Sequence, residues 1–182
     1  MKFSFESDQI IEDILHVLPT VFHDDRGWFK EMFSIEHFEG FTDPFVLISK
    51  SKTVKSGTVR GLHFQEGLDA QGKLVCCSVG SIFDVALDIR RGSTTFGKWT
   101  STILSSENHK LFWIPPGFAH GFQTIDDETE VLYFITNHHR PESERVIFPF
   151  DDELGIEWPL EISEISEKDL GAQKFGEYSE NR

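Results

Sequence analysis

Short runs of β-branched and aromatic residues, separated by turn residues, dominate the middle of this 182-residue chain. Turns are indicated at Val79-Gly80-Ser81 and at Pro115-Pro116-Gly117, and no long helical period interrupts the series. Many short strands joined by short turns predict an antiparallel sandwich or barrel in one domain, residues 1–182. We expect strands over residues 45–49, 73–79, 82–89, 99–104, 111–114 and 131–136.

The two ends of the chain are less regular. Residues 10–17 are apolar at mixed spacing and fit either a turn of helix or a strand. Ser166 followed three residues later by Asp169 has the form of an N-cap with an acidic N3 residue, so a short helix is expected to begin near Ser166. From about Gly176 the chain is polar, and we expect a loose tail there.

The formal net charge is −14, which argues against two classes of partner. Nonspecific nucleic-acid binding needs a basic surface, and an anionic membrane would repel this chain. A small anionic substrate is still compatible with this charge, because a local cluster of Arg and Lys can hold a diphosphate.

Cys76 and Cys77 are the only two cysteines, and they are adjacent. Neighbouring residues on a strand point to opposite faces, so these two are not expected to form a disulfide. The first fifteen residues show neither a signal peptide nor a transmembrane helix. These features together predict a cytoplasmic protein.

The segment from Arg60 to Gln65 is the first chemical signal. On a strand, His63 and Gln65 share one face with Gly61, and Arg60 lies on the other face unless the strand bends. A glycine two residues before a histidine leaves room for a ligand, although a hydrogen-bonded structural His63 explains the same pattern. Because Gln65 stands where a second histidine would complete His-x-His, no metal site is expected.

Four other side chains carry both a structural and a chemical interpretation. Lys73 at a strand start either extends to solvent or, if buried, stabilises an enolate oxygen. Residues 112–122 form either a buried hairpin or a pocket wall with His120 as a donor. Tyr133 fits a core position or a catalytic one. The capping box alone explains Asp169.

A series of ordered segments, taken together, resembles the dTDP-4-dehydrorhamnose 3,5-epimerase family. The resemblance extends from about His16 to about Leu170, nearly the whole chain. Its motifs are residues 25–31, 60–65, 70–75, 80–90, 92–99, 114–122, 132–133, 154–159 and 165–169.

This resemblance implies an all-β jelly-roll barrel of the cupin type, to which the capping signal adds a short C-terminal helical segment. It implies a homodimer that needs no metal and no organic cofactor. The implied reaction is epimerisation at C-3, C-5 or both of a nucleotide-diphosphate-linked 4-keto-6-deoxy sugar, and the implied small-molecule partner is that nucleotide sugar.

The catalytic roles implied by the resemblance agree with the chemistry of the side chains. His63 is the general base and Asp169 its orienting partner, since imidazole titrates near neutral pH and a carboxylate fixes its tautomer. Lys73 stabilises the enolate. Tyr133 returns a proton from the opposite side. In this interpretation Asp169 does more than cap a helix, although both roles can coexist.

The resemblance also implies a set of binding residues: Arg60, His120, Gln65 and Glu144 around the sugar and diphosphate, and Arg26, Phe29 and Glu31 at the nucleotide, from the neighbouring subunit. Three further positions depart from the family pattern. Ile48 and Lys50 stand where relatives commonly carry Gln and Asn, and His139 stands where they often carry a second Tyr. These departures predict a sugar nucleotide other than the thymidine-linked rhamnose precursor.

Two alternatives remain open at this stage. The first is a ketoisomerase on the same fold that moves the carbonyl between C-4 and C-3; Tyr133 opposite His63 argues for epimerisation instead. The second is a non-catalytic sugar-nucleotide-binding barrel. A pure binder has no reason to keep a proton relay, so the intact set of His63, Lys73, Tyr133 and Asp169 argues against it.

Overall fold

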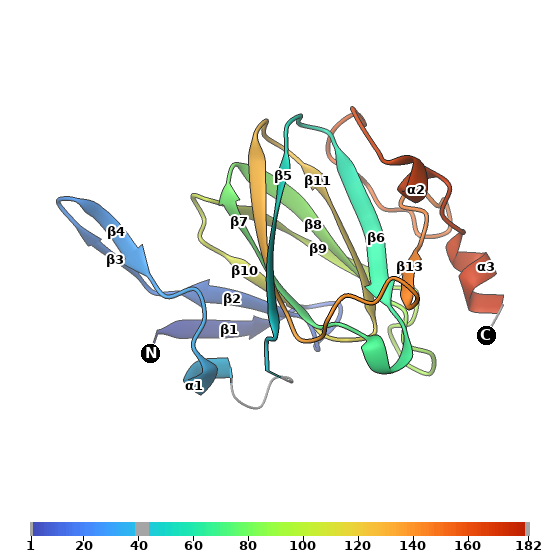
Figure 1. Cartoon of the computed structure of the whole chain (residues 1–182), viewed down its shortest axis with the longest axis horizontal. Helices are drawn as coiled ribbons and strands as arrows, with labels where there is room; N and C mark the ends of the chain where they lie inside the picture. The colour runs from blue at the N-terminus through green and yellow to red at the C-terminus, as the bar shows by residue number, and fades with distance from the viewer. Residues whose placement is uncertain (1, 39–43, 181–182) are drawn as a thin grey trace.

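Two antiparallel sheets face one another and enclose the core of this computed structural model, which describes residues 2–38 and 44–180 (Figure 1). One sheet has the order β1 (Phe3–Ser7), β2 (Leu15–Pro19), β10 (Leu111–Ile114), β7 (Lys73–Val79), β12 (Thr129–Ile135), β5 (Leu47–Thr53). The other has the order β13 (Glu144–Val146), β6 (Val59–Gln65), β11 (Phe118–Thr124), β8 (Ser81–Asp88), β9 (Trp99–Ser105). The predicted all-β jelly roll is confirmed.

The turns predicted from glycine and proline connect the two sheets rather than neighbouring strands. Residues 79–81 lead from β7 in the first sheet to β8 in the second, and residues 115–117 lead from β10 to β11 in the same way. Residues 112–122 are therefore not a hairpin. The strands at 73–79 and 111–114 have the predicted bounds, whereas β5 begins at Leu47 and extends four residues further than expected, to Thr53.

Side chains alternate between the interior of the barrel and the outer face of the six-stranded sheet. On β7, Val75 and Cys77 belong to the cluster between the sheets, whereas Leu74 and Cys76 belong to the cluster on the outer face. The two cysteines are free and lie on opposite faces, as their adjacency predicted.

The cluster on the outer face of the six-stranded sheet is rich in aromatic side chains. The segment that contains α1 (Ile35–Phe38) packs against the outer face of the six-stranded sheet, with the Phe3 and Phe38 ring centroids 5.3 Å apart. Aromatic members of this cluster are Phe3, Phe5, Phe33, Phe38, Phe45, Trp113 and Phe134.

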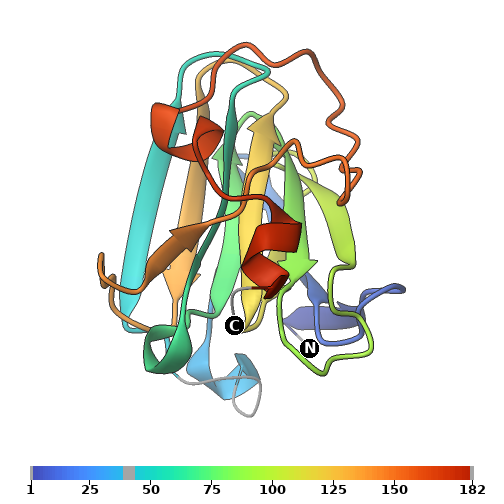
Figure 2. The ribbon, with the colours of Figure 1, turned by 90° about the vertical axis from the view of Figure 1, so that its right-hand side faces the viewer.

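The C-terminal segment lies across the five-stranded sheet (Figure 2). The helix predicted near Ser166 is α2 (Glu167–Leu170), and the Ser166 hydroxyl accepts a hydrogen bond from the Asp169 amide at its N-terminus. The expected loose tail is wrong over residues 176–180, because α3 (Phe175–Glu180) buries Phe175 and Tyr178 against this sheet. Residues 10–17 form a turn followed by the start of β2, with Asp8 accepting bonds from the turn amides.

A two-stranded hairpin of β3 (Val21–Asp24) and β4 (Gly27–Lys30), here called the arm, projects away from the barrel (Figure 1). Its Phe22, Trp28 and Phe29 side chains are more than half exposed. Among the described residues, no helix has both the length and the apolar character to cross a bilayer.

Candidate active site

A pocket of about 230 Å³ opens between the two sheets and collects side chains from six strands. His63 and Arg60 come from β6, Lys73 from β7, His120 from β11 and Tyr133 from β12. The remaining lining residues are Ser51, Gln71, Gly121, Phe122, Ile135 and Glu144. A larger hollow of about 710 Å³ adjoins it between β6 and the C-terminal segment and shares Arg60 and His63 as walls. The structure thus brings together the predicted catalytic side chains, which lie far apart in sequence.

A bulge in β6 directs both Arg60 and His63 into the pocket. His63 pairs with His120 of β11 and Arg60 pairs with Phe122, so three steps along β6 match two along β11. The strand therefore bends, and Arg60 does not point away from His63 as regular alternation would require. The space above Gly61 is occupied by backbone rather than by a ligand, because a Cβ there would lie 2.6 Å from the Gly121 Cα.

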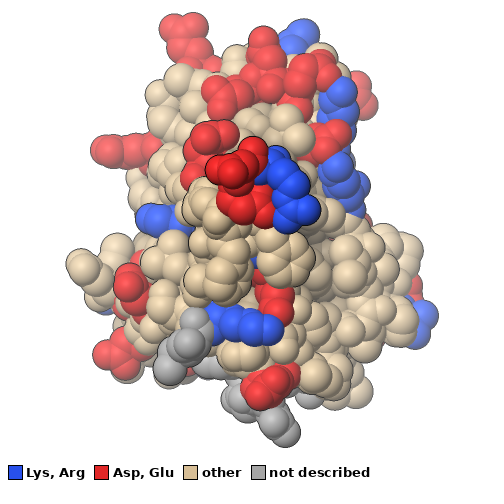
Figure 3. Space-filling model, turned by 90° about the vertical axis from the view of Figure 1, so that its left-hand side faces the viewer, with Lys and Arg blue, Asp and Glu red and all other residues tan. Residues whose placement is uncertain are grey.

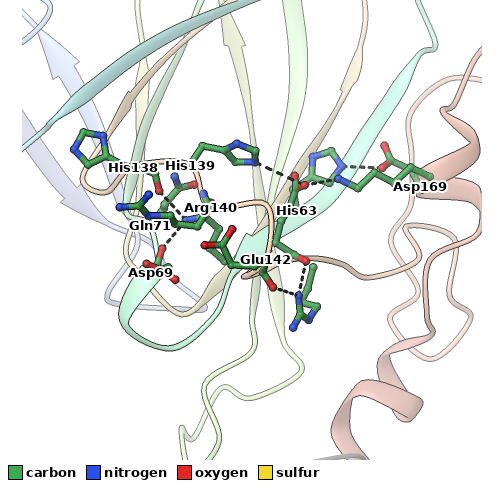
Figure 4. Close-up of polar contacts among 12 residues, drawn as sticks. His63, Asp69, Gln71, His138, His139, Arg140, Glu142 and Asp169 are labelled. Carbon is green, nitrogen blue, oxygen red and sulfur yellow. Dashed lines mark hydrogen bonds and ion pairs between the residues drawn. The ribbon is translucent and has the colours of Figure 1, made fainter.

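His63 and Asp169 form a hydrogen-bonded pair at the pocket wall (Figure 4). His63 Nε2 lies 2.7 Å from Asp169 Oδ1, and Asp169 Oδ2 accepts from the Gly61 amide at 3.0 Å. Burial alone would raise the pKa of Asp169, but the bonds from His63 and Gly61 hold it below its usual range. An ionised carboxylate only accepts, so Nε2 carries the hydrogen and Nδ1 of His63 is left as the basic atom. Asp169 also belongs to the capped α2, so both roles weighed for it coexist.

Lys73 lies deep in the same pocket. Burial lowers the pKa of its ammonium group to about 8, although the charges of Asp84 and Glu144 act in the opposite direction. Its Nζ lies 3.5 Å from the His63 carbonyl oxygen, at the limit of a hydrogen bond. A partly desolvated ammonium group with few partners is suited to an oxyanion that forms during a reaction.

His120 is hydrogen-bonded to a buried carboxylate, that of Asp84. Its Nε2 lies 2.8 Å from Oδ1 of Asp84, which is fully buried, and no partner among the described residues reaches Asp84 Oδ2. Burial lowers the pKa of His120, which favours the neutral ring. Burial also raises the pKa of Asp84. Because Nε2 faces Asp84, His120 can donate to a bound ligand only from Nδ1, and its predicted donor role stays a prediction.

Tyr133 packs edge-on against the His120 ring, with centroids 6.3 Å apart. Its hydroxyl lies 2.9 Å from the Ser51 hydroxyl of β5. Burial raises the pKa of Tyr133 well above its ordinary value, so the phenol keeps its proton in the resting protein.

The mouth of the pocket carries a small charge network. Glu144 accepts from Lys168 of α2 at 2.6 Å. His139, labelled in Figure 4, has its Nε2 3.8 Å from the same carboxylate. Burial opposes ionisation of Glu144, yet the contact with Lys168 lowers its pKa overall. His139 is half-exposed and therefore accessible to a bound ligand.

Gln65 has a supporting position. Its amide donates to the carbonyl oxygens of Asp69 and His138 and accepts from the Arg140 amide, so its polar atoms hold the loop that carries His139. Gln65 is buried and is not among the residues that line the pocket.

Two groups of predicted binding residues lie outside this pocket. Ile48 and Lys50 are exposed on the outer face of β5, where Lys50 pairs with Glu130, while the alternate residues of this strand face inward. Arg26 and Phe29 lie on the arm, and Glu31 directly after it pairs with Lys2. The structure does not bring either group to the His63 pocket of the same chain.

Three site residues were missed by reasoning from the sequence: Asp84, Ser51 and Lys168. Asp84 interrupts the apolar run from Ile82 to Leu87 in β8, which is a signal of a buried partner. Lys168 is adjacent to Asp169 and could have been included with it. Nothing in the sequence distinguishes Ser51 from the neighbouring Ser49. Among the described residues, no group of three or more potential ligand side chains could hold a metal ion.

Comparison with known proteins finds a matching family model and related enzymes. A family model described as dTDP-4-dehydrorhamnose 3,5-epimerase matches residues 8–177. The chain is 49% identical over 166 residues to dTDP-4-dehydrorhamnose 3,5-epimerase of Salmonella typhimurium, which covers 89% of this chain and 90% of that relative.

Two solved structures with a similar fold contain dTDP-sugars. The crystal structure of dTDP-6-deoxy-D-glucose-3,5-epimerase from Legionella pneumophila, in complex with dTDP-4-keto-L-rhamnose, is similar with a TM-score of 0.91 at 42% identity and covers 96% of this chain and 93% of that one. A 3'-monoepimerase from Streptomyces bikiniensis in complex with dTDP-quinovose is similar with a TM-score of 0.89 at 27% identity, covering 96% and 89% of the two chains.

Proposed function

The chain belongs to the dTDP-4-dehydrorhamnose 3,5-epimerase family, and from that premise we propose how its own residues invert the sugar centres. It is an isomerase that epimerises a nucleotide-linked 4-keto-6-deoxy sugar. We propose that His63, Lys73, Tyr133 and Asp169 are the catalytic set. The observation that carries this assignment is the hydrogen-bonded His63–Asp169 pair in one pocket with Lys73 and Tyr133.

The reaction begins with proton removal beside the ketone. Nδ1 of His63 takes the proton, the electrons of the C–H bond form the enolate, and Asp169 stabilises the resulting imidazolium. The ammonium group of Lys73 neutralises the developing oxyanion. A hydroxyl proton from Tyr133 then forms the new C–H bond on the opposite face, and the ketone returns. General base or acid catalysis of this kind contributes about 10²–10⁴-fold in rate.

We propose the thymidine diphosphate form as the substrate. The relatives at the highest identities carry this nucleotide in their names, and the bound sugars in the similar structures are dTDP-linked. The argument for another nucleotide rested on three positions, and Ile48 and Lys50 lie on the outer face of β5. Of the three positions, only His139 lies at the pocket mouth, where it can affect which substrate is preferred.

A homodimer is the second part of the proposal. The arm extends away from its own barrel with Phe29 about two-thirds exposed, and a broad uncharged stretch of surface lies on the same side of the molecule (Figure 3). Isolated apolar arms are unfavourable in water, and a second copy would bury this one. In such a dimer, Arg26, Phe29 and Glu31 reach the nucleotide in the neighbouring pocket. The cytoplasmic location expected from sequence stays a prediction.

The test is incubation with a panel of dTDP-, GDP- and CDP-linked 4-keto-6-deoxy sugars in deuterated water, with the labelled carbons identified by NMR. We expect deuterium at C-3 and C-5 of the dTDP compound and inverted product at both. Deuterium at C-4 of a product whose carbonyl has moved to C-3 would support the ketoisomerase. Binding without any label would support the non-catalytic barrel, and a preferred GDP or CDP compound would restore the specificity prediction.

A further inference from the structure

We propose that Ser51 is a proton relay that reprotonates Tyr133 between the two inversions, which makes double epimerisation possible within one binding event. This inference rests on the proposed function, because it concerns what happens after Tyr133 has given its first proton. It assigns a role to a hydroxyl group that the catalytic mechanism has not used.

The first supporting observation is the contact itself. The Ser51 and Tyr133 hydroxyl oxygens are 2.9 Å apart, and Ser51 is the hydrogen-bond partner of this phenol among the described residues. A serine hydroxyl donates one hydrogen and accepts others at the same time, so it can pass a proton along. The neighbouring Ser49 faces Tyr133 across the strand pair, yet the hydrogen bond is made by Ser51.

The second observation is the environment of the phenol. Burial raises the pKa of Tyr133, so the phenolate formed by proton donation is unfavourable and must be reprotonated before the next inversion. The other pocket groups have other roles: in the proposed mechanism Lys73 neutralises the oxyanion, and His120 Nε2 is already hydrogen-bonded to Asp84.

The third observation is the position of Ser51 between the phenol and the exterior. β5 is the last strand of its sheet, and Ser51 is half-buried, so it lines the pocket without being sealed inside it. Water at this edge can hydrogen-bond to Ser51 while the bound sugar covers Tyr133.

The proton balance of the relay is complete. The Tyr133 O–H bond breaks as the new C–H bond forms, and the phenolate then takes the hydrogen of Ser51. Ser51 takes a proton from solvent water in the same event. The proton that His63 removed returns to solvent from the imidazolium, so each inversion exchanges one substrate hydrogen with solvent and consumes nothing else.

The experiment compares Ser51→Ala, Ser51→Thr and Ser78→Ala. Ser78 lies in the same sheet, and its hydroxyl donates to the Glu130 carbonyl, so its variant removes a hydroxyl with no path to Tyr133. With dTDP-4-keto-6-deoxyglucose in deuterated water, rapid-quench mixing followed by NMR counts singly and doubly inverted product per active site.

We expect Ser51→Ala to keep a first burst close to one inverted centre per site, followed by a steady state at least about 10-fold slower, with singly inverted sugar accumulating. Ser51→Thr should restore double inversion, and Ser78→Ala should behave as the unmodified protein. If Ser51 only positions the ring, the burst falls in the same proportion as the steady state and the relay is overturned. An unchanged product ratio in a folded Ser51→Ala protein also overturns it. Failure of the unmodified protein to exchange any proton instead rejects the proposed function.

Discussion

The pocket and the arm differ in how completely one chain supplies their contacts. In the pocket, His63 is bonded to Asp169, His120 to Asp84 and Tyr133 to Ser51, all within one chain. The arm exposes Phe22, Trp28 and Phe29 and touches the barrel chiefly through Lys30 and Trp28 at His109.

This difference separates proton transfer from recognition. Groups that must move protons need fixed geometry before substrate arrives, which a folded interior provides. An exposed apolar arm buries its side chains only against a second surface, so recognition of the nucleotide can depend on assembly while the proton chemistry does not. The predictions below test that division.

The largest effect is expected from His63→Asn, which keeps the size of the side chain and removes the base. Deuterium exchange at both carbons should fall by about 10²–10⁴-fold while the far-UV spectrum and melting temperature stay close to those of the unmodified protein. NMR of the recovered sugar measures the exchange. Near-normal exchange in the folded variant would show that another group is the base.

An arm variant, Arg26→Ala with Phe29→Ala, should lose roughly 10- to 150-fold in kcat/KM, since burying one Phe is worth about 1.5–3 kcal/mol. The informative step is to mix it with the His63→Asn protein under conditions that exchange subunits. In a mixed dimer the intact arm completes the intact pocket of the other chain, and random assortment restores about one quarter of all sites. No recovery, despite mixed dimers seen by native mass spectrometry, means that the arm serves its own chain or none.

A third prediction concerns pH. The pKa of Lys73 is lowered to about 8, and the protonated form is the active one, so kcat/KM should hold at neutral pH and fall as pH rises through about 8. Asp84→Asn removes a negative charge that raises the pKa of Lys73, so the decline should begin at lower pH.

The matched control for that profile is Asp8→Asn, because Asp8 is another buried carboxylate that holds a histidine, His16, with an oxygen–nitrogen distance of 3.1 Å far from the pocket. Its pH profile should match that of the unmodified protein. Equal shifts in both variants would indicate a general loss of stability rather than an effect on Lys73.

The smallest effect is expected on the outer face of β5. Lys50→Asn installs the amide that relatives commonly carry, but because the side chain points away from the pocket, kcat/KM for the dTDP substrate should change by less than about twofold. His139→Ala at the pocket mouth should lower it more. A marked gain in dTDP selectivity from Lys50→Asn would place this residue at a nucleotide and revise the assignment of the strand faces.

The sequence by itself determined the sheet-rich fold and the sites of the main turns, and it named the side chains that we propose as the catalytic set. Strand alternation also separated Cys76 from Cys77, and the capping signal located α2. The fold, turn, cysteine and capping predictions are confirmed because they depend on local periodicity and on local turn and cap chemistry.

Tertiary structure alone decided which face each side chain occupies and which residues it contacts. The bulge that turns Arg60 toward His63 arises from pairing with β11, and the inward face of β5 excludes Ile48 and Lys50 from the pocket. The partners Asp84 and Ser51 come from strands distant in sequence, and the tail became a helix because the sheet offered Tyr178 a buried site. Each of these depends on contacts between segments far apart in the chain, and local sequence patterns do not specify which segments meet.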